Sequence, residues 1–275
     1  MQIGIFETIF RRASLSESLD AVLSHSIRCL QFDLSSAGIS HDAANISEER
    51  CRNAQQLLSA RGMTMSAVSG TFNMAHPDSR HRERGLESLR AIAAHCRFLG
   101  TPVITLCSGT RNTESMWHVH PENGSAAAWN DLLPTMKKAA AIGEEHRVVM
   151  AFEPEVSNVI DSAKRARKML DEVGSSALKV VMDGANIFHA GELPKMRDIL
   201  SEAFELLGKD IVLAHAKDLD HDGEAGHRAA GEGLLDYDFY LSGLKRVNFN
   251  GALVLHGLNE AQVPGCLEFV KRKLS

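Results

Sequence analysis

Four apolar segments in the second half of the chain are each followed by a side chain that can bind a metal ion or move a proton. The segments at 148–152, 178–182, 211–214 and 252–255 lead directly into Glu153, Asp183, His215 and His256. Short aliphatic runs of this kind are typical of parallel strands that are buried on both faces. If these strands are neighbours in one parallel sheet, their last residues emerge at the same edge, so the four side chains can converge.

Two carboxylates and two imidazoles form a mixed oxygen and nitrogen site that suits a divalent metal ion. Mn, Co, Zn, Mg and Fe(II) all accept such ligands, so the residue types do not select the metal. A single polar residue after a strand is more often a cap than a ligand. Four of them after four successive strands favour a site for one divalent metal ion, with Glu153, Asp183, His215 and His256 as its ligands.

Short apolar runs alternate with longer amphipathic runs along the whole chain, 1–275, without a linker. Strands are predicted at 2–6, 29–34, 64–68, 102–107, 147–152, 177–182, 210–214 and 252–255. Helices are predicted at 14–26, 46–61, 79–98, 125–146, 158–173, 194–208, 235–247 and 260–273. Eight strand–helix units indicate a single α/β domain that is a closed (β/α)8 TIM barrel, rather than an open sheet.

The C-terminal strand ends of such a barrel, with the loops after them, form its active face. All four candidate ligands belong to that face, as do the two longest loops, 108–124 and 216–233. No Gly-x-Gly-x-x-Gly segment follows the first strand, which argues against a dinucleotide-binding fold.

The composition excludes several classes of partner. A formal net charge of −5 argues against nucleic acid or an anionic membrane surface as the main partner. No segment approaches 18 apolar residues, so no membrane span is expected. The five cysteines are odd in number and form no Cys-x-x-Cys pair, which is typical of reduced, packed thiols. With no signal peptide visible, these features predict a cytoplasmic protein.

Several motifs resemble the xylose isomerase-like TIM barrels, a superfamily of sugar and sugar-phosphate isomerases and epimerases, inosose dehydratase and endonuclease IV. They are Ala151-Phe152-Glu153-Pro154-Glu155, Val181-Met182-Asp183-Gly184-Ala185-Asn186, Ala214-His215-Ala216-Lys217-Asp218 and Gly231-Glu232-Gly233. The resemblance covers essentially the whole chain. It implies that Glu153, Asp183 and His215 bind a divalent metal and that Gly231 and Gly233 help to shape a sugar pocket.

Two residues depart from the family pattern. His256 stands where the fourth ligand is usually a glutamate, so it is either a ligand or an acid–base group. Ketose 3-epimerases use a glutamate on each side of the sugar, and here only Glu153 remains of that pair. Asn186 replaces a histidine of many relatives, which removes a ligand of the three-metal endonuclease site and leaves endonuclease activity as a minor alternative.

Further residues are candidates for contacts with the substrate. Lys217 can polarise a carbonyl group and is counted among the catalytic candidates with Glu153 and His256, although a surface role is open for Lys217 and for Asp218. An aromatic loop residue suits a sugar ring, and an arginine suits a hydroxyl or phosphate group. Asn158 is expected to cap the helix predicted at 158–173. The substrate-binding candidates are Arg228, Trp117, His118, Asn186 and Glu155.

The resulting hypothesis is a divalent-metal-dependent isomerase or epimerase of a sugar, keto-sugar or sugar phosphate that acts through an enediolate-type proton transfer. A lyase or dehydratase of a keto-sugar or inosose is the main alternative, because elimination shares the intermediate and the pair Glu153 and His256 is asymmetric. A sugar-binding barrel without catalysis is a further alternative. The expected partner is a small carbohydrate, and a homo-oligomer is compatible with the resemblance.

Overall fold

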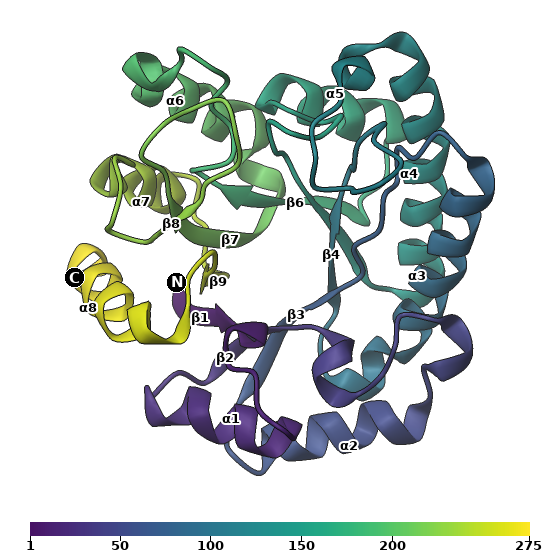
Figure 1. Cartoon of the computed structure of the whole chain (residues 1–275), viewed down its shortest axis with the longest axis vertical. Helices are drawn as coiled ribbons and strands as arrows, with labels where there is room; N and C mark the ends of the chain where they lie inside the picture. Colours follow the sequence, from purple (N-terminus) through teal and green to yellow (C-terminus); the bar gives the residue numbers. More distant parts are fainter.

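The computed structural model describes residues 1–275. Eight parallel strands form a closed barrel, in which each strand pairs with the next, β7 pairs with β9, and β9 returns to β1 (Figure 1). The barrel strands are β1 Gln2–Phe6, β2 Cys29–Phe32, β3 Thr64–Ser69, β4 Val103–Cys107, β5 Val149–Glu153, β6 Leu178–Asp183, β7 Ile211–Asp218 and β9 Ala252–Leu255. A ninth strand of two residues, β8 Arg228–Ala229, pairs antiparallel with the end of β7. The predicted (β/α)8 TIM barrel is confirmed.

Helices surround the barrel on the outside (Figure 1). They are α1 Leu15–Ser24, α2 Glu48–Ser59, α3 Ser79–Leu99, α4 Ala126–His146, α5 Ala163–Val173, α6 Met196–Leu207, α7 Tyr237–Arg246 and α8 Val263–Leu274. Serine side chains accept a backbone N–H at the start of α1, α2, α4 and α5, which satisfies a donor that the helix leaves free. None of these helices is both long and apolar enough to cross a membrane.

The expectation that Asn158 caps the fifth helix is wrong. The helix begins at Ala163 and is capped by Ser162. Asn158 is buried in the preceding segment, where its side-chain oxygen accepts a hydrogen bond of 2.7 Å from the backbone N–H of Gly109. The chain between β5 and α5 is therefore fastened to the loop that follows β4, and both segments border the same end of the barrel.

Small and branched side chains fill the inside of the barrel, as expected for a packed core rather than a pore. They are Cys29, Ala67, Ala151, Val181, Leu213, Ala252 and Val254. Successive side chains of a strand point to opposite faces, so the residue two positions after an inward one also points inward. By this alternation, Glu153 points inward like Ala151, and Asp183 points inward like Val181. His215 and Lys217 point inward like Leu213.

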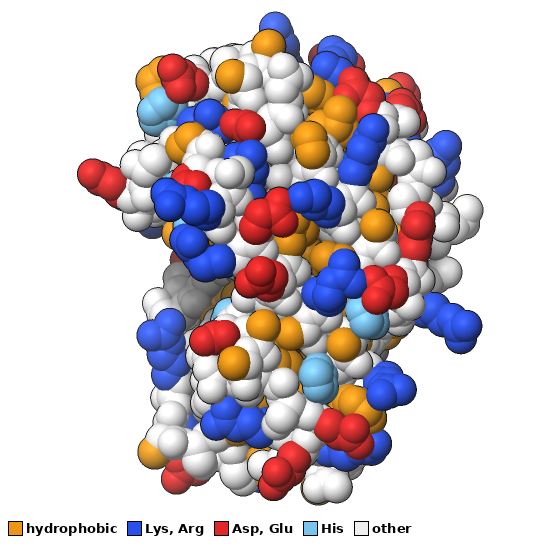
Figure 2. All heavy atoms as spheres, turned by 90° about the vertical axis from the view of Figure 1, so that its right-hand side faces the viewer, with side chains coloured by type: hydrophobic (Ala, Val, Ile, Leu, Met, Phe, Trp, Pro, Cys, Tyr) orange, Lys and Arg blue, Asp and Glu red, His pale blue; other side chains and the backbone are white.

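The larger hydrophobic core lies between the strands and the helices. All five cysteines are free and buried, which confirms that they are packed thiols. On the face that carries α3 and α4, basic and acidic side chains are interspersed (Figure 2). The two helices are joined there by the ion pairs Lys138–Glu83 and Arg90–Glu145.

Candidate active site

A cavity of about 940 Å³ lies at the C-terminal end of the barrel strands. Residues from most of the strands, and from the loops after β4 and β7, line it. Of the residues that the sequence singles out, the lining includes Trp117, His118, Glu153, Glu155, Asn186, His215, Lys217 and His256. Asp183 is almost completely buried beside His215 and Lys217. The strand-end residues and the β4-loop residues therefore meet in one cavity.

Glu153, Asp183 and His215 place three potential metal ligands within 4.8 Å of one another. The β6–β7 register sets Asp183 directly beside His215. His215 Nδ1 lies 3.4 Å from a Glu153 oxygen and 3.7 Å from Asp183 Oδ2. Both Asp183 Oδ2 and His215 Nδ1 are buried without a hydrogen-bond partner, which is costly unless another group satisfies them. An unpartnered carboxylate oxygen and an unpartnered imidazole nitrogen beside a second carboxylate, that of Glu153, fit a divalent cation.

Neighbouring polar groups fix the orientation of these three side chains. The Gln31 side-chain oxygen lies 2.8 Å from His215 Nε2, so the ring donates its Nε2–H there and turns Nδ1 toward Glu153 and Asp183. Asp183 Oδ1 accepts the N–H of Ala185 at 2.9 Å. Asn186 donates to Glu153 at 2.5 Å. Gln31 was missed from the sequence, although it stands two residues after Cys29 and therefore on the inward face of β2.

The electrostatic field at the group of three favours a cation. Burial lowers the pKa of the His215 imidazole, but the charges of Glu153 and Asp183 outweigh it and raise the pKa to about 9. Burial likewise opposes the charge of Lys217, whose pKa is nevertheless raised by the carboxylates of Asp183, Glu153 and Glu155. The Lys217 ammonium lies 3.6 Å from Asp183 Oδ2 and lines the cavity. Lys217 is thus a buried charged donor at the cavity, not a surface residue.

His256 follows β9 but does not belong to the group of donors that lie within 4.8 Å. Its ring is stacked between Phe6, with centroids 5.2 Å apart, and His215, with centroids 4.8 Å apart. Burial, together with the positive charges of His215 and Lys217, holds the pKa of His256 well below its usual value. His256 Nδ1 has no hydrogen-bond partner. His256 is therefore a neutral imidazole at the cavity wall.

Glu155 is a second carboxyl group close to Glu153. It is almost completely buried and lines the cavity. Burial, reinforced by the charge of Glu153, raises the pKa of Glu155 to about 7. A carboxyl group with such a pKa is present in both protonation states near neutrality, so it can donate or accept a hydrogen bond with a bound hydroxyl group.

Asp218 organises the glycine turn after β7. Its buried carboxylate accepts hydrogen bonds from the N–H groups of Leu219, Gly231 and Leu235 at 2.9–3.0 Å. A Cβ atom on Gly233 would lie 2.4 Å from Asp218 Oδ1, so only glycine fits there. Asp218 thus shapes the loop after β7 instead of contacting the cavity or lying on the surface.

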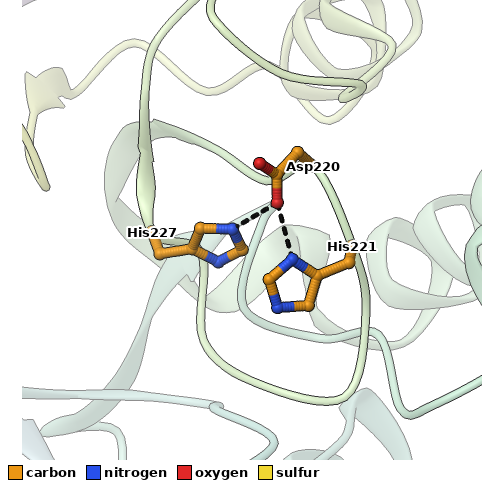
Figure 3. A group of neighbouring side chains, drawn as sticks. All are labelled: Asp220, His221 and His227. Atoms are coloured by element: carbon orange, nitrogen blue, oxygen red, sulfur yellow. Dashed lines mark hydrogen bonds and ion pairs between the residues drawn. The ribbon is translucent and has the colours of Figure 1, made fainter.

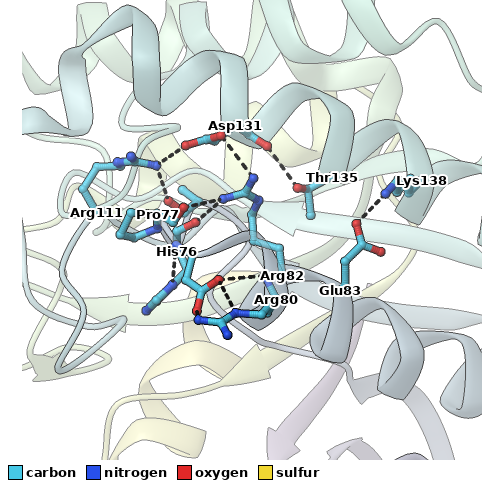
Figure 4. A network of polar contacts seen from close by, with 11 residues as sticks. His76, Pro77, Arg80, Arg82, Glu83, Arg111, Asp131, Thr135 and Lys138 are labelled. Carbon is cyan, nitrogen blue, oxygen red and sulfur yellow. Dashed lines mark hydrogen bonds and ion pairs between the residues drawn. The ribbon is translucent and has the colours of Figure 1, made fainter.

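The loop after β4 brings an apolar surface to the cavity. Met116, Trp117 and Val119 line it, and Trp117 is 58% exposed. A shared carboxylate anchors this loop: Asp131 of α4 accepts hydrogen bonds from Arg111 of the loop at 2.6 Å and from Arg82 of α3 at 3.1 Å (Figure 4). The Arg111 guanidinium also donates to the Ala75 carbonyl at 3.0 Å. Asp131 therefore holds the loop and the two helices together.

Arg228, expected to contact the substrate, does not line the cavity. Its side chain is half exposed and donates to Asp220 at 2.6 Å. The cavity lining also includes polar residues that sequence reasoning missed, among them Arg11, Asp33 and His41. His41 Nε2 lies 3.2 Å from Asp33. Asp33 directly follows β2, so the rule that identified the other strand-end residues could have found it too.

Comparison with known proteins agrees with the fold. A family model described as xylose isomerase-like TIM barrel matches residues 19–271. A D-tagatose 3-epimerase-like protein superposes with a TM-score of 0.79 at 15% identity, covering 100% of this chain and 97% of that one. The 3-keto-D-glucoside 4-epimerase of E. coli gives 0.75 at 15% identity, covering 99% of each chain. The D-psicose 3-epimerase of Clostridium cellulolyticum H10 gives 0.76 at 14% identity, covering 100% of each. This chain therefore belongs to the xylose isomerase-like TIM barrel family.

Proposed function

We propose that this protein is a divalent-metal-dependent isomerase or epimerase of a sugar, keto-sugar or sugar phosphate. The observation that carries the proposal is the group of Glu153, Asp183 and His215, whose buried, unpartnered donor atoms converge beside a cavity that also holds Lys217 and His256. The structural neighbours named above include enzymes that epimerise keto-sugars and a keto-glucoside, which supports this class of substrate.

The three ligands would hold one divalent cation, and that cation would supply Lewis-acid polarisation of a substrate carbonyl. The chain's own residues then determine what is possible around it. Lys217 Nζ can donate a hydrogen bond to the same carbonyl or to the neighbouring hydroxyl. Gln31 and Asn186 keep His215 and Glu153 in fixed positions, so little reorganisation is needed when substrate arrives.

Proton transfer falls to Glu153 and His256 in this proposal. In the circular order of the strands, β5 and β9 lie on either side of β6 and β7. Glu153 and His256 therefore flank Asp183 and His215, and both line the cavity. In an epimerisation, one of the two groups removes the proton beside the carbonyl group as a base, and the other returns a proton from its own protonated form, so the pair holds one proton in total before and after the reaction.

Elimination is the second candidate. The proposed acid–base pair consists of a carboxylate and an imidazole, whereas a symmetric epimerisation would use two equivalent bases. The cavity supplies additional proton donors for a departing hydroxyl group, namely Lys217 and Glu155. A keto-sugar or inosose would then lose water from the same enediolate-type intermediate.

Turnover in heavy water tests the proposal. The protein, loaded with Mn²⁺, is incubated with ketohexoses, keto-glucosides and inososes, and products are followed by NMR. Deuterium uptake with an epimer or aldose as the product supports isomerisation, and loss of water supports elimination. Glu153→Gln should abolish uptake, while Glu145→Gln on the exposed α3–α4 face should not change it. Near-normal turnover by Glu153→Gln, or a bound sugar that no condition converts, contradicts the proposal; the latter result supports a binding-only barrel.

A further inference from the structure

A second group of potential metal ligands lies outside the barrel, on the loop between β7 and β8. Asp220, His221 and His227 place one ligand atom each within 4.8 Å of one another. Figure 3 shows both imidazole rings directed at the same carboxylate oxygen. His221 Nδ1 and His227 Nε2 each lie 2.6 Å from Asp220 Oδ1. Nothing in the proposed sugar chemistry uses these three residues.

Glu224 meets the other side of the two rings. Its Oε1 atom lies 3.1 Å from His221 Nε2 and 3.4 Å from His227 Nδ1. All four imidazole nitrogens therefore face a carboxylate oxygen. A neutral imidazole carries only one N–H, so two of these four contacts then bring a lone pair against a carboxylate. The arrangement is satisfied either by two charged histidines or by a cation that replaces protons between the rings and the carboxylates.

Arg228 does not occupy the oxygen that both rings approach. It binds the other oxygen of the carboxylate, Asp220 Oδ2, at 2.6 Å. The guanidinium thus holds Asp220 in place and leaves Oδ1 directed at the two histidines. Two imidazoles and two carboxylates form a borderline ligand set that suits Zn²⁺, and also Co²⁺, Ni²⁺ or Cu²⁺, better than Mg²⁺.

The loop that carries this group also forms part of the cavity wall. Gly223, Glu224 and Ala225 line the cavity. The Gly226 N–H donates to the Asn186 side-chain oxygen at 2.8 Å, and Asn186 in turn donates to Glu153. A Cβ atom on Gly226 would lie 2.6 Å from Ala185 Cβ, so the loop closely approaches the turn that follows β6. An ion bound by Asp220, His221 and His227 would therefore fix the loop between β7 and β8. This loop contacts Asn186, which in turn contacts Glu153 of the proposed metal site.

We propose that Asp220, His221 and His227, with Glu224 as a fourth donor, form a second binding site for a divalent transition metal such as Zn²⁺, and that the bound ion clamps the loop between β7 and β8 over the cavity. This site is independent of the proposed catalytic ion, because it shares no ligand with Glu153, Asp183 and His215.

Calorimetric titration of the metal-free protein with Zn²⁺ tests the proposal. Wild-type protein should bind two equivalents. The double variant His221→Ala/His227→Ala should lose one of them, or bind it at least tenfold more weakly, and Asp183→Ala should lose the other. His146→Ala, at the far end of the barrel, is the matched histidine control and should bind as wild type does. Equal binding by wild type and the double variant would overturn the loop site and favour charged histidines.

Limited proteolysis provides a second readout. Zn²⁺ should protect residues 219–228 from cleavage in wild type and in Asp183→Ala, but not in the double variant. Because both histidines are at the surface, the double variant should fold normally, and its thermal melting checks this. If Asp183→Ala retains zinc and the double variant loses it, the loop site is supported even if Glu153, Asp183 and His215 bind no metal. Unchanged cleavage in wild type with zinc would contradict the clamp.

Discussion

The imidazole rings of His215 and His256 lie face to face, with centroids 4.8 Å apart and planes within 5° of parallel. Ring nitrogens direct their lone pairs in the plane of the ring, so two parallel stacked rings direct them side by side and not toward one point. In the proposed function the two residues therefore have different roles. His215 lies in the group with Glu153 and Asp183, and His256, which lies outside that group, is the residue that we propose to take part in proton transfer.

Replacement of His256 by alanine should therefore keep the metal and remove activity. We expect the metal content after loading with Mn²⁺ and desalting to equal that of wild type, and kcat to fall by about 100-fold or more, as is usual when a general acid or base is removed. Elemental analysis and steady-state kinetics measure both quantities. Asp183→Ala is the comparison and should lose one equivalent of metal. Loss of the same equivalent by His256→Ala would make His256 a fourth ligand.

Replacement of Trp117 by alanine should weaken substrate binding without altering the chemical step. Trp117 belongs to the loop after β4, and its indole ring is 58% exposed and lines the cavity, where it can cover a sugar ring. We expect KM to rise about tenfold with kcat nearly unchanged, because stacking contributes equally to the bound substrate and the transition state. Leu234→Ala, which removes a side chain of similar exposure outside the cavity, should leave KM unchanged. A fall in kcat at constant KM would exclude this role.

The barrel could be predicted from the sequence because it is encoded locally. Each strand is a short apolar run, each helix an amphipathic one, and the alternation of the two determines a parallel sheet. The same local logic placed Glu153, Asp183 and His215 at one end, since a strand fixes the side from which its last residue emerges. The β6–β7 register then sets Asp183 beside His215, as the pattern implied.

The remaining parts of the site depend on how loops fold back, which no local pattern encodes. Arg228 lies in β8, just before the glycine turn, but its guanidinium reaches Asp220 and not the cavity. Asn158 has the residue type of a helix cap, yet the Gly109 N–H binds it from another loop. Gln31 is a polar residue within an apolar strand, and only the closure of the barrel brings it to His215 from β2.

Replacement of Asp131 by alanine should destabilise the protein and loosen the β4 loop. The change leaves the Arg82 and Arg111 guanidinium groups, which are only 12% and 11% exposed, without their common carboxylate. Because Asp131 itself is about one-third exposed, we expect a loss of about 2 kcal/mol in the free energy of unfolding, less than for a fully buried pair. Urea unfolding measures the loss, and KM should rise with it.

The control for this change is Asp238→Ala. It breaks the Lys273–Asp238 ion pair, in which the carboxylate is 73% exposed, and should alter the free energy of unfolding by less than about 0.5 kcal/mol. Equal effects of the two variants would show that the shared carboxylate does not stabilise the loop.

Glu7 should make the protein less stable as the pH rises. The side chain follows β1, is 1% exposed, and neither carboxylate oxygen has a hydrogen-bond partner. Burial, reinforced by the charge of Asp33, raises the pKa of Glu7 to about 8. Below the unfolded pKa both states are protonated. Between about pH 5 and pH 8 only the unfolded state releases the proton, so the contribution of Glu7 to the free energy of unfolding falls by about 1.4 kcal/mol per pH unit.

Glu7→Gln keeps the shape of the side chain and removes the titration. The free energy of unfolding of this variant minus that of wild type should therefore be nearly constant at pH 4–5 and larger by a few kcal/mol at pH 8, so the variant is then the more stable protein. Urea unfolding of both proteins at pH 5, 6.5 and 8 measures the difference. The control is Glu17→Gln, which replaces an exposed glutamate of the α1 capping box. The effect of this control on the free energy of unfolding should not grow with pH in this range. If the difference between Glu7→Gln and wild type stays the same at all three pH values, Glu7 is ionised in the folded protein and its burial is compensated by its surroundings.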